Sequence, residues 1–178
     1  NELLDAHRAD AGTLRINAPM SFGMRVLPDV LAEFAALHPK IQLEVALTDE
    51  MVDIVDADYD LAIRISGPPS DKFTIWRKIC VVERLLVAAP DTSLAQARHP
   101  NDVPRDACMA FSKDSRQEVW ELAHATARIS ITAGKCVSAN NGELLAALAV
   151  KGQGVALLPE FIVADALAAG TLVRVLPD

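Results

Sequence analysis

The stretch LRINAPMSFGMRVLPDVLAEFAALHPKIQLEVAL, residues 14–47, decides the fold class of this chain. Apolar and polar residues alternate over residues 14–17 and again over residues 41–47, which is the period of a β-strand. Between them, apolar residues recur from Leu27 to Leu37 at the i, i+3, i+4, i+7 spacing of one buried helical face. The stretch therefore predicts a strand, a helix and a second strand, which is the β-α-β unit of a parallel sheet.

The turn after the first strand is a candidate binding site, because ligands of parallel sheets bind beyond the carboxyl ends of the strands. Ser21 offers a hydroxyl where the helix would begin, and the free amides of Phe22 and Gly23 would receive an anion. The alternative is that Ser21 only caps its own helix. Pro28 would then stand past the first turn, so the helix either kinks there or begins nearer Arg25.

The composition describes a protein with a sizeable core and an acidic net charge. With 178 residues, 51% of them hydrophobic and 4% aromatic, the chain is long enough for one α/β domain or two small lobes. Its net charge of −7 argues against direct binding of nucleic acid, which needs clustered Lys and Arg. No apolar run approaches the ~20 residues that span a membrane, and no signal peptide opens the chain. Because the first residue is not Met, we expect a fragment whose true amino terminus is missing.

The residue types that most often carry catalysis or bind metals form no motif. Cys80, Cys108 and Cys136 are an odd number without a CxxC pair, which favours reduced, buried thiols of a cytosolic protein over a disulfide framework or a redox switch. The four histidines have no metal-ligand spacing. Gly152-Gln153-Gly154 follows a predicted helix and precedes a predicted strand. A dinucleotide-binding loop has the opposite order, because it follows a strand and precedes a helix. We therefore expect no catalytic residue, no metal and no cofactor.

The rest of the chain is predicted to alternate between short strands and helices. Apolar runs predict strands at residues 61–63, which would be buried, and at 75–79, 84–89, 108–111, 129–131, 155–158 and 172–175. Helices are predicted at residues 49–55, 93–98, 118–127, 144–150 and 159–167, and the end of an amphipathic helix at residues 1–11. The proline-rich, polar stretch after Pro90 predicts a boundary between two lobes.

Polar side chains stand at several of these predicted strand ends and helix starts. Arg64 and Ser66 would emerge at the carboxyl end of a buried strand, and Ser112 follows another. The guanidinium of Arg64 suits a bidentate carboxylate, although a solvated arginine at a strand end fits the same pattern. Asn140-Asn141, with Glu143 three residues after Asn140, imitates a capping box. Plain helix capping is the competing interpretation of these asparagines.

Six short motifs, each weak alone, occur in an order that resembles the effector-binding domain of a LysR-type transcriptional regulator. They are GTLRI (12–16), APMSFG (18–23), LAEF with HP (31–34, 38–39), YDLAIR (59–64), LVAAP (86–90) and GQGVALLP (152–159). The resemblance implies an α/β protein with two Rossmann-like lobes of the type 2 periplasmic-binding-protein fold, joined by two crossover segments. It implies a lobe I of residues 12–87 and 160–178 and a lobe II of residues 88–159.

The same resemblance implies a binding site and a mechanism. A small anionic effector would bind between the lobes, at Ser21, Phe22, Gly23, Arg64, Ser66, Ser112, Asn140, Asn141 and Pro159. Binding would bias the angle between the lobes, and with it the geometry of a homodimer or tetramer on DNA. Only an N-terminal winged helix-turn-helix domain, absent from this chain, would hold the DNA, and residues 1–11 would end the linker helix that joins it.

The remaining expectations concern partners and rival functions. By the resemblance, the protein is bacterial and cytoplasmic, makes no membrane contact, and dimerises through the exposed side of helix 27–37 against helix 144–150 of another chain. A periplasmic solute-binding protein of a transporter would share the fold and is the main alternative. A small hydrolase or transferase is a second one, but it lacks an assembled nucleophile and base.

Overall fold

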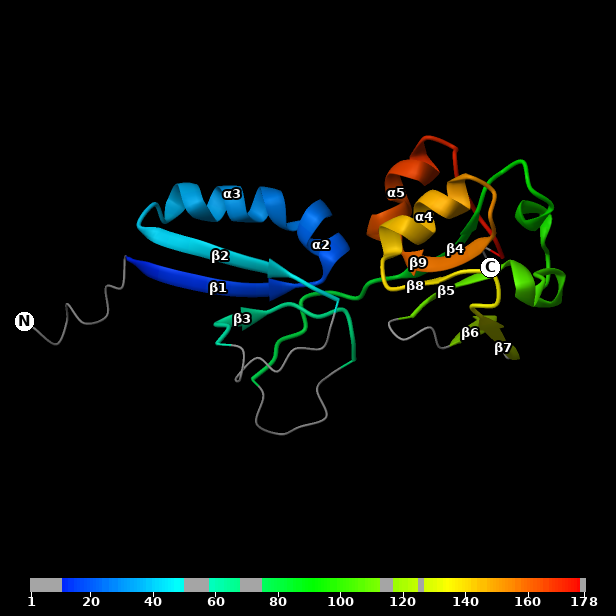
Figure 1. Ribbon diagram of the computed structural model, residues 1–178, viewed down its shortest axis with the longest axis horizontal. Helices are drawn as coiled ribbons and strands as arrows, with labels where there is room; N and C mark the ends of the chain where they lie inside the picture. Colours follow the sequence, from blue (N-terminus) through cyan, green and yellow to red (C-terminus); the bar gives the residue numbers. More distant parts are fainter. Residues whose placement is uncertain (1–10, 50–57, 68–74, 113–116, 125–126, 177–178) are drawn as a thin grey trace, which may run out of the picture. The chain divides into compact units, whose positions relative to one another are not determined.

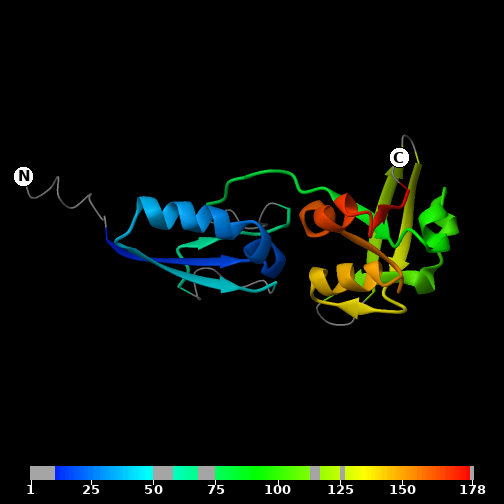
Figure 2. The same cartoon turned by 90° about the horizontal axis from the view of Figure 1, so that it is seen from above.

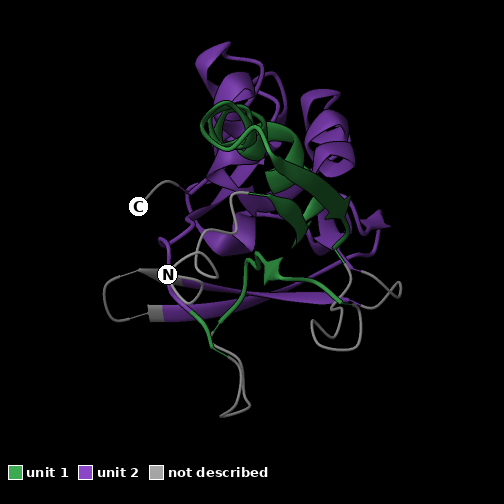
Figure 3. Cartoon of the chain, turned by 90° about the vertical axis from the view of Figure 1, so that its left-hand side faces the viewer, with its two compact units in different colours: residues 1–76 green, residues 77–178 purple. Residues whose placement is uncertain are grey.

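The computed structural model describes residues 11–49, 58–67, 75–112, 117–124 and 127–176 (Figure 1). The chain divides into two compact units, residues 1–76 and residues 77–178, which Figure 3 colours separately. Each unit is described below by itself. None of the described helices is long and apolar enough to cross a membrane.

The first unit contains the predicted β-α-β arrangement. Its sheet has the order β2-β1-β3, with β1 at Gly12–Ala18, β2 at Ile41–Leu47 and β3 at Leu61–Ala62. Both pairings are parallel, and Leu14 of β1 stands opposite Leu43 of β2. The long helix α3, Leu27–Leu37, runs along one face of β1 and β2 (Figure 1). The strand-helix-strand prediction is therefore confirmed.

The connection between β1 and α3 contains a separate short helix, α2, at Met20–Arg25. Val26 separates the two helices, and Pro28 falls in the first turn of α3. A proline is tolerated there, because the amide that it lacks has no intrahelical acceptor in that turn. The second of the two alternatives for Pro28 is thus the observed one, since a new helix begins just after Arg25.

Helix α3 buries less of its apolar face than its spacing predicts. Leu27 is buried, but the side chains of Val30 and Leu37 are 55% and 69% exposed. At 100° per residue these two project about 60° and 80° to one side of Leu27. The predicted single buried face is therefore wrong for Val30 and Leu37, which form an exposed flank of the helix.

The second unit is built on a five-stranded sheet of order β10-β4-β9-β5-β8. Its strands are β4 Arg84–Ala88, β5 Cys108–Phe111, β8 Ser138–Ala139, β9 Val155–Pro159 and β10 Val173–Arg174. β5 is parallel to both β8 and β9, whereas β4 is antiparallel to β9 and β10. The described part of this unit also contains the α-helices α4, Gly142–Val150, and α5, Glu160–Ala168. Its 3-10 helices are η1 Ser93–Gln96, η2 Pro100–Asp102 and η3 Arg105–Ala107.

Both faces of this second sheet are covered by hydrophobic clusters. Leu85 and Met109 point to one face, where they pack with Leu145 of α4 and Ile162 of α5. The alternate residues of the same strands point to the other face, where Leu86, Cys108 and Ala110 pack with Val103, Trp120 and Ile131. The predicted strands 84–89, 108–111 and 155–158 are confirmed as the buried centre of this sheet.

Residues 118–127, predicted to be a helix, begin a β-hairpin instead. β6, Glu118–His124, pairs antiparallel with β7, Ala127–Ala133, and the pair extends as two long strands in Figure 2. Trp120 is buried in the second cluster, while Glu121 on the opposite side is exposed. Burial of the indole and pairing with β7 outweigh the helical propensity of the Glu, Leu and Ala residues.

Several smaller predictions differ from the structure. β3 has two residues, and Leu61 is 47% exposed rather than buried. The predicted strand 75–79 has no regular structure. The helices predicted at residues 1–11 and 49–55 lie almost wholly outside the described residues. In the second unit α5 packs on β9 and β10 pairs with β4, and the assignment of residues 160–178 to lobe I stays a prediction.

Candidate functional site

The carboxyl ends of the three strands of the first unit come together at one edge of its sheet. The Thr48 amide donates to the Ala18 carbonyl at 2.9 Å, and the Ile63 amide donates to the Asn17 carbonyl at 2.8 Å. These bonds extend the parallel pairing past the ends of β2 and β3. Ser21 and Arg64, which follow two of these strands, are therefore brought to the same edge.

Helix α2 begins at this edge, but its start differs from the predicted one. Ser21 is buried inside the first turn and does not cap the helix, because Pro19 holds the capping position. The Met20 amide donates to Oδ1 of Asp49 at 3.1 Å. A carboxylate from the end of β2 therefore already occupies the helix start, which weakens the case for an anion there.

The expectation of a free Gly23 amide is wrong, since this amide donates to the Pro19 carbonyl at 2.8 Å. Gly23 has a packing role instead, because a Cβ at this position would collide with the Leu47 side chain. Phe22 lies in the same turn and is half-buried. Whether either residue touches an effector stays a prediction.

Arg64 is half-buried at the end of β3, and one side of its guanidinium is unsatisfied. Its Nη1 donates to the carbonyl of Ile63 at 2.8 Å, whereas its Nη2 is buried without a hydrogen-bond partner among the described residues. Burial lowers the pKa of the Arg64 guanidinium, an effect that Tyr59 opposes. A buried unpaired donor costs about 1–3 kcal/mol, so this atom favours a ligand that accepts hydrogen bonds. Ser66, in contrast, is exposed and donates its hydroxyl to the carbonyl of Gly67 at 3.0 Å.

Asn17 is a candidate residue that the sequence analysis missed. It is fully buried in β1, between Ile16 and Ala18. Its Nδ2 donates to the Ala46 carbonyl at 3.3 Å, but its Oδ1 has no donor among the described residues. The available signal was a residue of low β-propensity in a strand with buried neighbours.

The second unit brings a second polar set to one sheet edge. Because β5, β8 and β9 are parallel, the residues that end or follow them, Ser112, Asn140 and Pro159, share that edge. The Ser112 amide donates to the Ala139 carbonyl at 2.9 Å. The hydroxyl of Ser138, within β8, is buried without a partner among the described residues. The topology therefore gathers residues that lie far apart in the sequence.

The helix start at this edge is capped one residue later than predicted. Oδ1 of Asn141 accepts the Leu144 amide at 2.9 Å, and Asn140 is exposed. The capping box predicted from Asn140 is therefore wrong, and Asn141 has the capping role that the sequence analysis kept as the competing interpretation.

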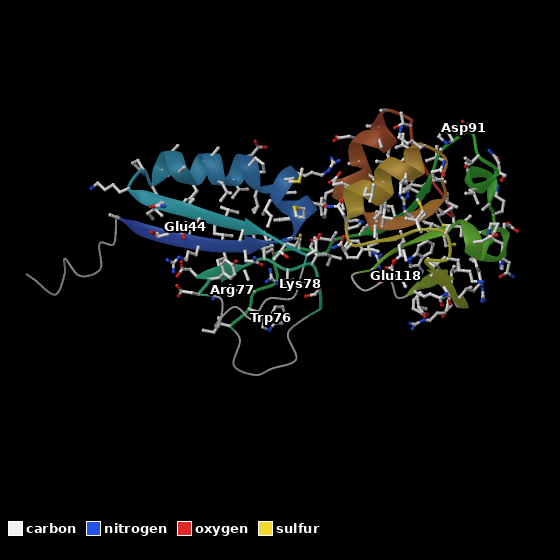
Figure 4. The ribbon with its side chains drawn as sticks, in the orientation of Figure 1. Glu44, Trp76, Arg77, Lys78, Asp91 and Glu118 are labelled. Carbon is white, nitrogen blue, oxygen red and sulfur yellow. The ribbon has the colours of Figure 1, made fainter. Side chains whose placement is uncertain are left out.

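Glu118 is a further polar residue near this edge, and it accepts three hydrogen bonds. Oε2 accepts the Phe111 amide and the Trp120 indole N–H, both at 2.9 Å. Oε1 accepts Nη2 of Arg84 at 2.6 Å, and the same nitrogen donates to the Leu157 carbonyl at 2.9 Å. Glu118, labelled in Figure 4, thus connects the end of β5 to β4 and β9 through hydrogen bonds. The bond at β5 is made by Phe111, the residue directly before Ser112. It was missed because its stretch was predicted to be a helix.

A cavity in the first unit is a further polar feature, and it is less suited to an anionic ligand. A cavity of about 420 Å³ in the first unit is lined by Arg15, Glu44 and Tyr59. Arg15 pairs there with Glu44 at 3.1 Å and with Asp58, and the hydrogen bond to Glu44 is the main cause that raises the Arg15 pKa. Its charge is thus already neutralised. Among the described residues, no three His, Cys, Asp or Glu side chains form a group that could hold a metal ion.

Parallel strands with polar residues at their carboxyl ends, in a fold shared with full-length AphB, define the chain as a ligand-binding α/β domain of the type 2 periplasmic-binding-protein class. The family described as LysR substrate binding domain matches residues 7–178. The chain belongs to this family and is the effector-binding domain of a LysR-type transcriptional regulator.

Named relatives agree with this assignment. PtxR of Pseudomonas aeruginosa, an HTH-type transcriptional regulator, is 32% identical over 179 residues, which cover 99% of this chain and 57% of PtxR. DmlR of Escherichia coli, also an HTH-type regulator, is 31% identical over 182 residues, covering 100% of this chain and 59% of DmlR. Full-length AphB, a virulence activator of Vibrio cholerae, has a TM-score of 0.79 at 25% identity, covering 99% of this chain and 61% of AphB. The chain thus spans less than two thirds of each relative.

Proposed function

We propose that the first unit binds a small anionic effector at the carboxyl ends of its parallel strands, and that the domain acts by binding rather than by catalysis. The observation that carries this proposal is the buried Nη2 of Arg64, which has no hydrogen-bond acceptor among the described residues. A carboxylate supplies that acceptor and compensates the desolvated charge. In the first unit the proposed contacts are Ser21, Phe22, Gly23, Arg64 and Ser66, as expected from the sequence, to which we add Asn17. In the second unit, Ser112, Asn140, Asn141 and Pro159 stay proposed as effector contacts, and we add Ser138.

The two added residues narrow the chemistry of the effector. Oδ1 of Asn17 only accepts hydrogen bonds, whereas the hydroxyl of Ser138 both donates and accepts. Because Oδ1 of Asn17 is buried, a ligand that satisfies it must bring a donor such as a hydroxyl. The proposed class is therefore a small carboxylate that also carries a hydroxyl group.

A thermal-shift and calorimetry screen tests this proposal with matched pairs of small mono- and dicarboxylates, with and without a hydroxyl. A ligand at 100 times its dissociation constant stabilises the folded state by about 2.7 kcal/mol, which gives a clear rise in Tm. Arg64→Ala should abolish the rise, and Arg64→Lys should restore it in part. Arg128→Ala, which removes an exposed arginine of β7, is the control. Unchanged affinity in Arg64→Ala would remove this residue from the site.

The role of the whole protein is also a proposal. We infer that the remaining part of the protein includes a DNA-binding domain and that the effector changes how that domain holds DNA in the bacterial cytoplasm. The net charge of −7 supports this division of labour, because an acidic domain is unsuited to phosphate contacts. Sequencing the codons upstream of residue 1 tests it. A basic helix-turn-helix segment would support regulation, whereas a hydrophobic segment with a small-residue cleavage site would indicate a secreted binding protein.

Self-association through α3 and α4 of neighbouring chains remains part of the proposal. The flank of α3 exposes Val30 and Leu37, and α4 exposes Leu144 and Val150 at 51% and 38%. Apolar side chains on one helix flank are stabilised when a second chain covers them. Light scattering should show a dimer that Leu37→Asp converts to a monomer. Ala36→Asp, about 180° from Leu27 on the same helix, should leave the dimer intact.

A further inference from the structure

The second unit contains a cavity at the unpaired edge of its β-hairpin. Among the described residues β7 pairs only with β6, so the other edge of β7 belongs to no larger sheet. The segment of residues 100–105, which contains η2 and the first residue of η3, stands opposite that edge. The cavity between them has a volume of about 360 Å³, and its lining includes Pro100, Val103, Pro104, Arg105, Ile129 and Ile131. This volume lies within the range of small-molecule sites.

The segment opposite β7 cannot pair with that strand, because its backbone polar groups are missing or already used. Pro100 and Pro104 have no amide to donate. The Pro100 carbonyl accepts the Val103 amide at 3.2 Å, and the Pro104 carbonyl accepts the Ala107 amide at 2.9 Å. A strand needs free amides and carbonyls to extend a ladder. The 3-10 turns therefore keep the edge of β7 open.

The inner wall of the cavity is apolar and belongs to the second hydrophobic cluster. Val103 and Ile131 are 4% and 5% exposed, and both pack in the cluster that contains Trp120. Ile129 lies two residues before Ile131, so it shares the same face of β7, and it is half-buried. An apolar group of a ligand would be removed from water against this wall, which favours its binding.

Arg105 is the one charged residue in the lining that the structure describes. Its side chain forms no hydrogen bond or ion pair with a described residue. The hydroxyl of Ser130, which also lines the cavity, already donates to Oε1 of Glu121 at 2.7 Å. The guanidinium of Arg105 is therefore available to a ligand, and a guanidinium binds a carboxylate through two parallel hydrogen bonds.

We propose that this cavity is a second ligand site, which takes a small carboxylate with an apolar body. Arg105 binds the carboxylate, and Val103, Ile129 and Ile131 cover the apolar body. This site goes beyond the proposed effector site and does not depend on it. Its residue Arg105 begins η3, which leads into the amino end of β5, whereas Ser112 follows the carboxyl end of the same strand.

Calorimetry with three probes tests the chemistry of the second ligand site. Phenylacetate has an apolar ring and a carboxylate, phenylacetamide has the ring without the charge, and acetate has the charge without the ring. We expect phenylacetate to bind at least about tenfold more tightly than either of the others, because each of them lacks one of the two contacts. Equal affinities for phenylacetate and phenylacetamide, or no binding of phenylacetate at millimolar concentration, would overturn the proposal.

Variants separate this site from the effector site of the first unit. Arg105→Ala should weaken the binding of phenylacetate about tenfold, and Ile129→Ala should weaken it by a smaller factor. Arg174→Ala, which removes an exposed arginine of β10, is the matched control for the loss of charge and should leave the affinity unchanged. Arg64→Ala should also leave it unchanged. Loss of binding in Arg64→Ala but not in Arg105→Ala would overturn the second site and support the effector site.

A nitrogen-15 NMR titration of the unmodified chain locates the bound phenylacetate. We expect the largest changes in chemical shift at the backbone amides of Val103, Arg105, Ser130 and Ile131, which line the cavity. Changes confined to residues outside this lining would overturn the proposal, even if the affinity matched the calorimetric expectation.

Discussion

Both units contain parallel strands and helices, yet they bury these elements to different extents. In the second unit both faces of the sheet carry a hydrophobic cluster, and α4 contributes the fully buried Leu145 and Ala149. In the described part of the first unit, α3 buries only Leu27 completely, and β2 leaves Val45 40% exposed. A helix between two parallel strands therefore does not by itself determine how much apolar surface the fold covers. The second unit has its own core, whereas the flank of α3 is available to another chain.

Truncation of one leucine in each unit gives the largest expected contrast. Leu145→Ala removes a fully buried side chain from the second unit and should lower the free energy of unfolding by about 3 kcal/mol. Leu37→Ala, measured at a protein concentration at which the chain is monomeric, removes an exposed side chain from α3 and should cost less than about 0.5 kcal/mol. Urea unfolding followed by far-ultraviolet circular dichroism measures both costs, because this signal reports the secondary structure of both units. Equal costs would contradict the comparison.

Added methyl groups at two glycines sharpen the same contrast. A Cβ at Gly154 would collide with the backbone carbonyl of Ala107, so Gly154→Ala should cost about 2 kcal/mol. A Cβ at Gly23 would meet the flexible end of the Leu47 side chain, and alanine favours the helix. Gly23→Ala should therefore cost less than about 1 kcal/mol. A larger loss at Gly23, measured by thermal unfolding, would mean that the first unit is the more tightly packed.

Alkaline pH tests whether the core of the second unit excludes charge. The unfolded chain ionises Cys108 from its ordinary pKa of 9.0, whereas the folded chain holds the proton until its pKa of about 11. The stabilisation that the protonated Cys108 thiol gives the folded state is therefore fully present below pH 9.0, and it is lost as the pH rises toward 11. By pH 10 the loss of unfolding free energy should be roughly 1 kcal/mol. Cys108→Ala should show a shallower fall of stability between pH 8 and pH 10 in urea titrations, and identical slopes would refute the prediction.

The smallest expected effect concerns the helix cap at the polar edge of the second unit. Asn141→Ala removes the acceptor of the Leu144 amide and should cost about 1 kcal/mol. Asn140→Ala is the matched control, because this exposed side chain caps no helix in the structure. Thermal unfolding of both variants measures the difference. A larger loss of stability in Asn140→Ala than in Asn141→Ala would support the capping box that the sequence pattern suggested.

Much of the fold was predictable because the hydrophobic periodicity of the sequence agrees with the positions of its proline and glycine residues. The alternation in residues 41–47 and the Pro28 break are local signals, and both led to the observed elements. Gly152 and Gly170 end α4 and α5 with φ of +72° and +70°, as their position after each predicted helix required. The helix predicted at residues 118–127 failed for a non-local reason, since only β7 and the second cluster make a strand of it.

The candidate site divides in the same way. Arg64 and Ser112 were predicted from the sequence because each follows an apolar run that ends a strand, and the Asn140-Asn141 pair was predicted because it precedes a helix. Asn17, Ser138 and Glu118 were not, because their roles depend on what surrounds them. Asn17 is an ordinary polar residue in the sequence, and it becomes informative only when its Oδ1 is buried without a donor among the described residues.

The sequence by itself determined the family, the parallel strands and the polar residues at their ends, because hydrophobic periodicity and turn residues act over a few neighbours. Only the tertiary structure decided which apolar faces are covered and which of two adjacent asparagines caps α4. Those outcomes depend on contacts between residues far apart in the chain. Their free energy comes from burial and strand pairing, which no local pattern contains.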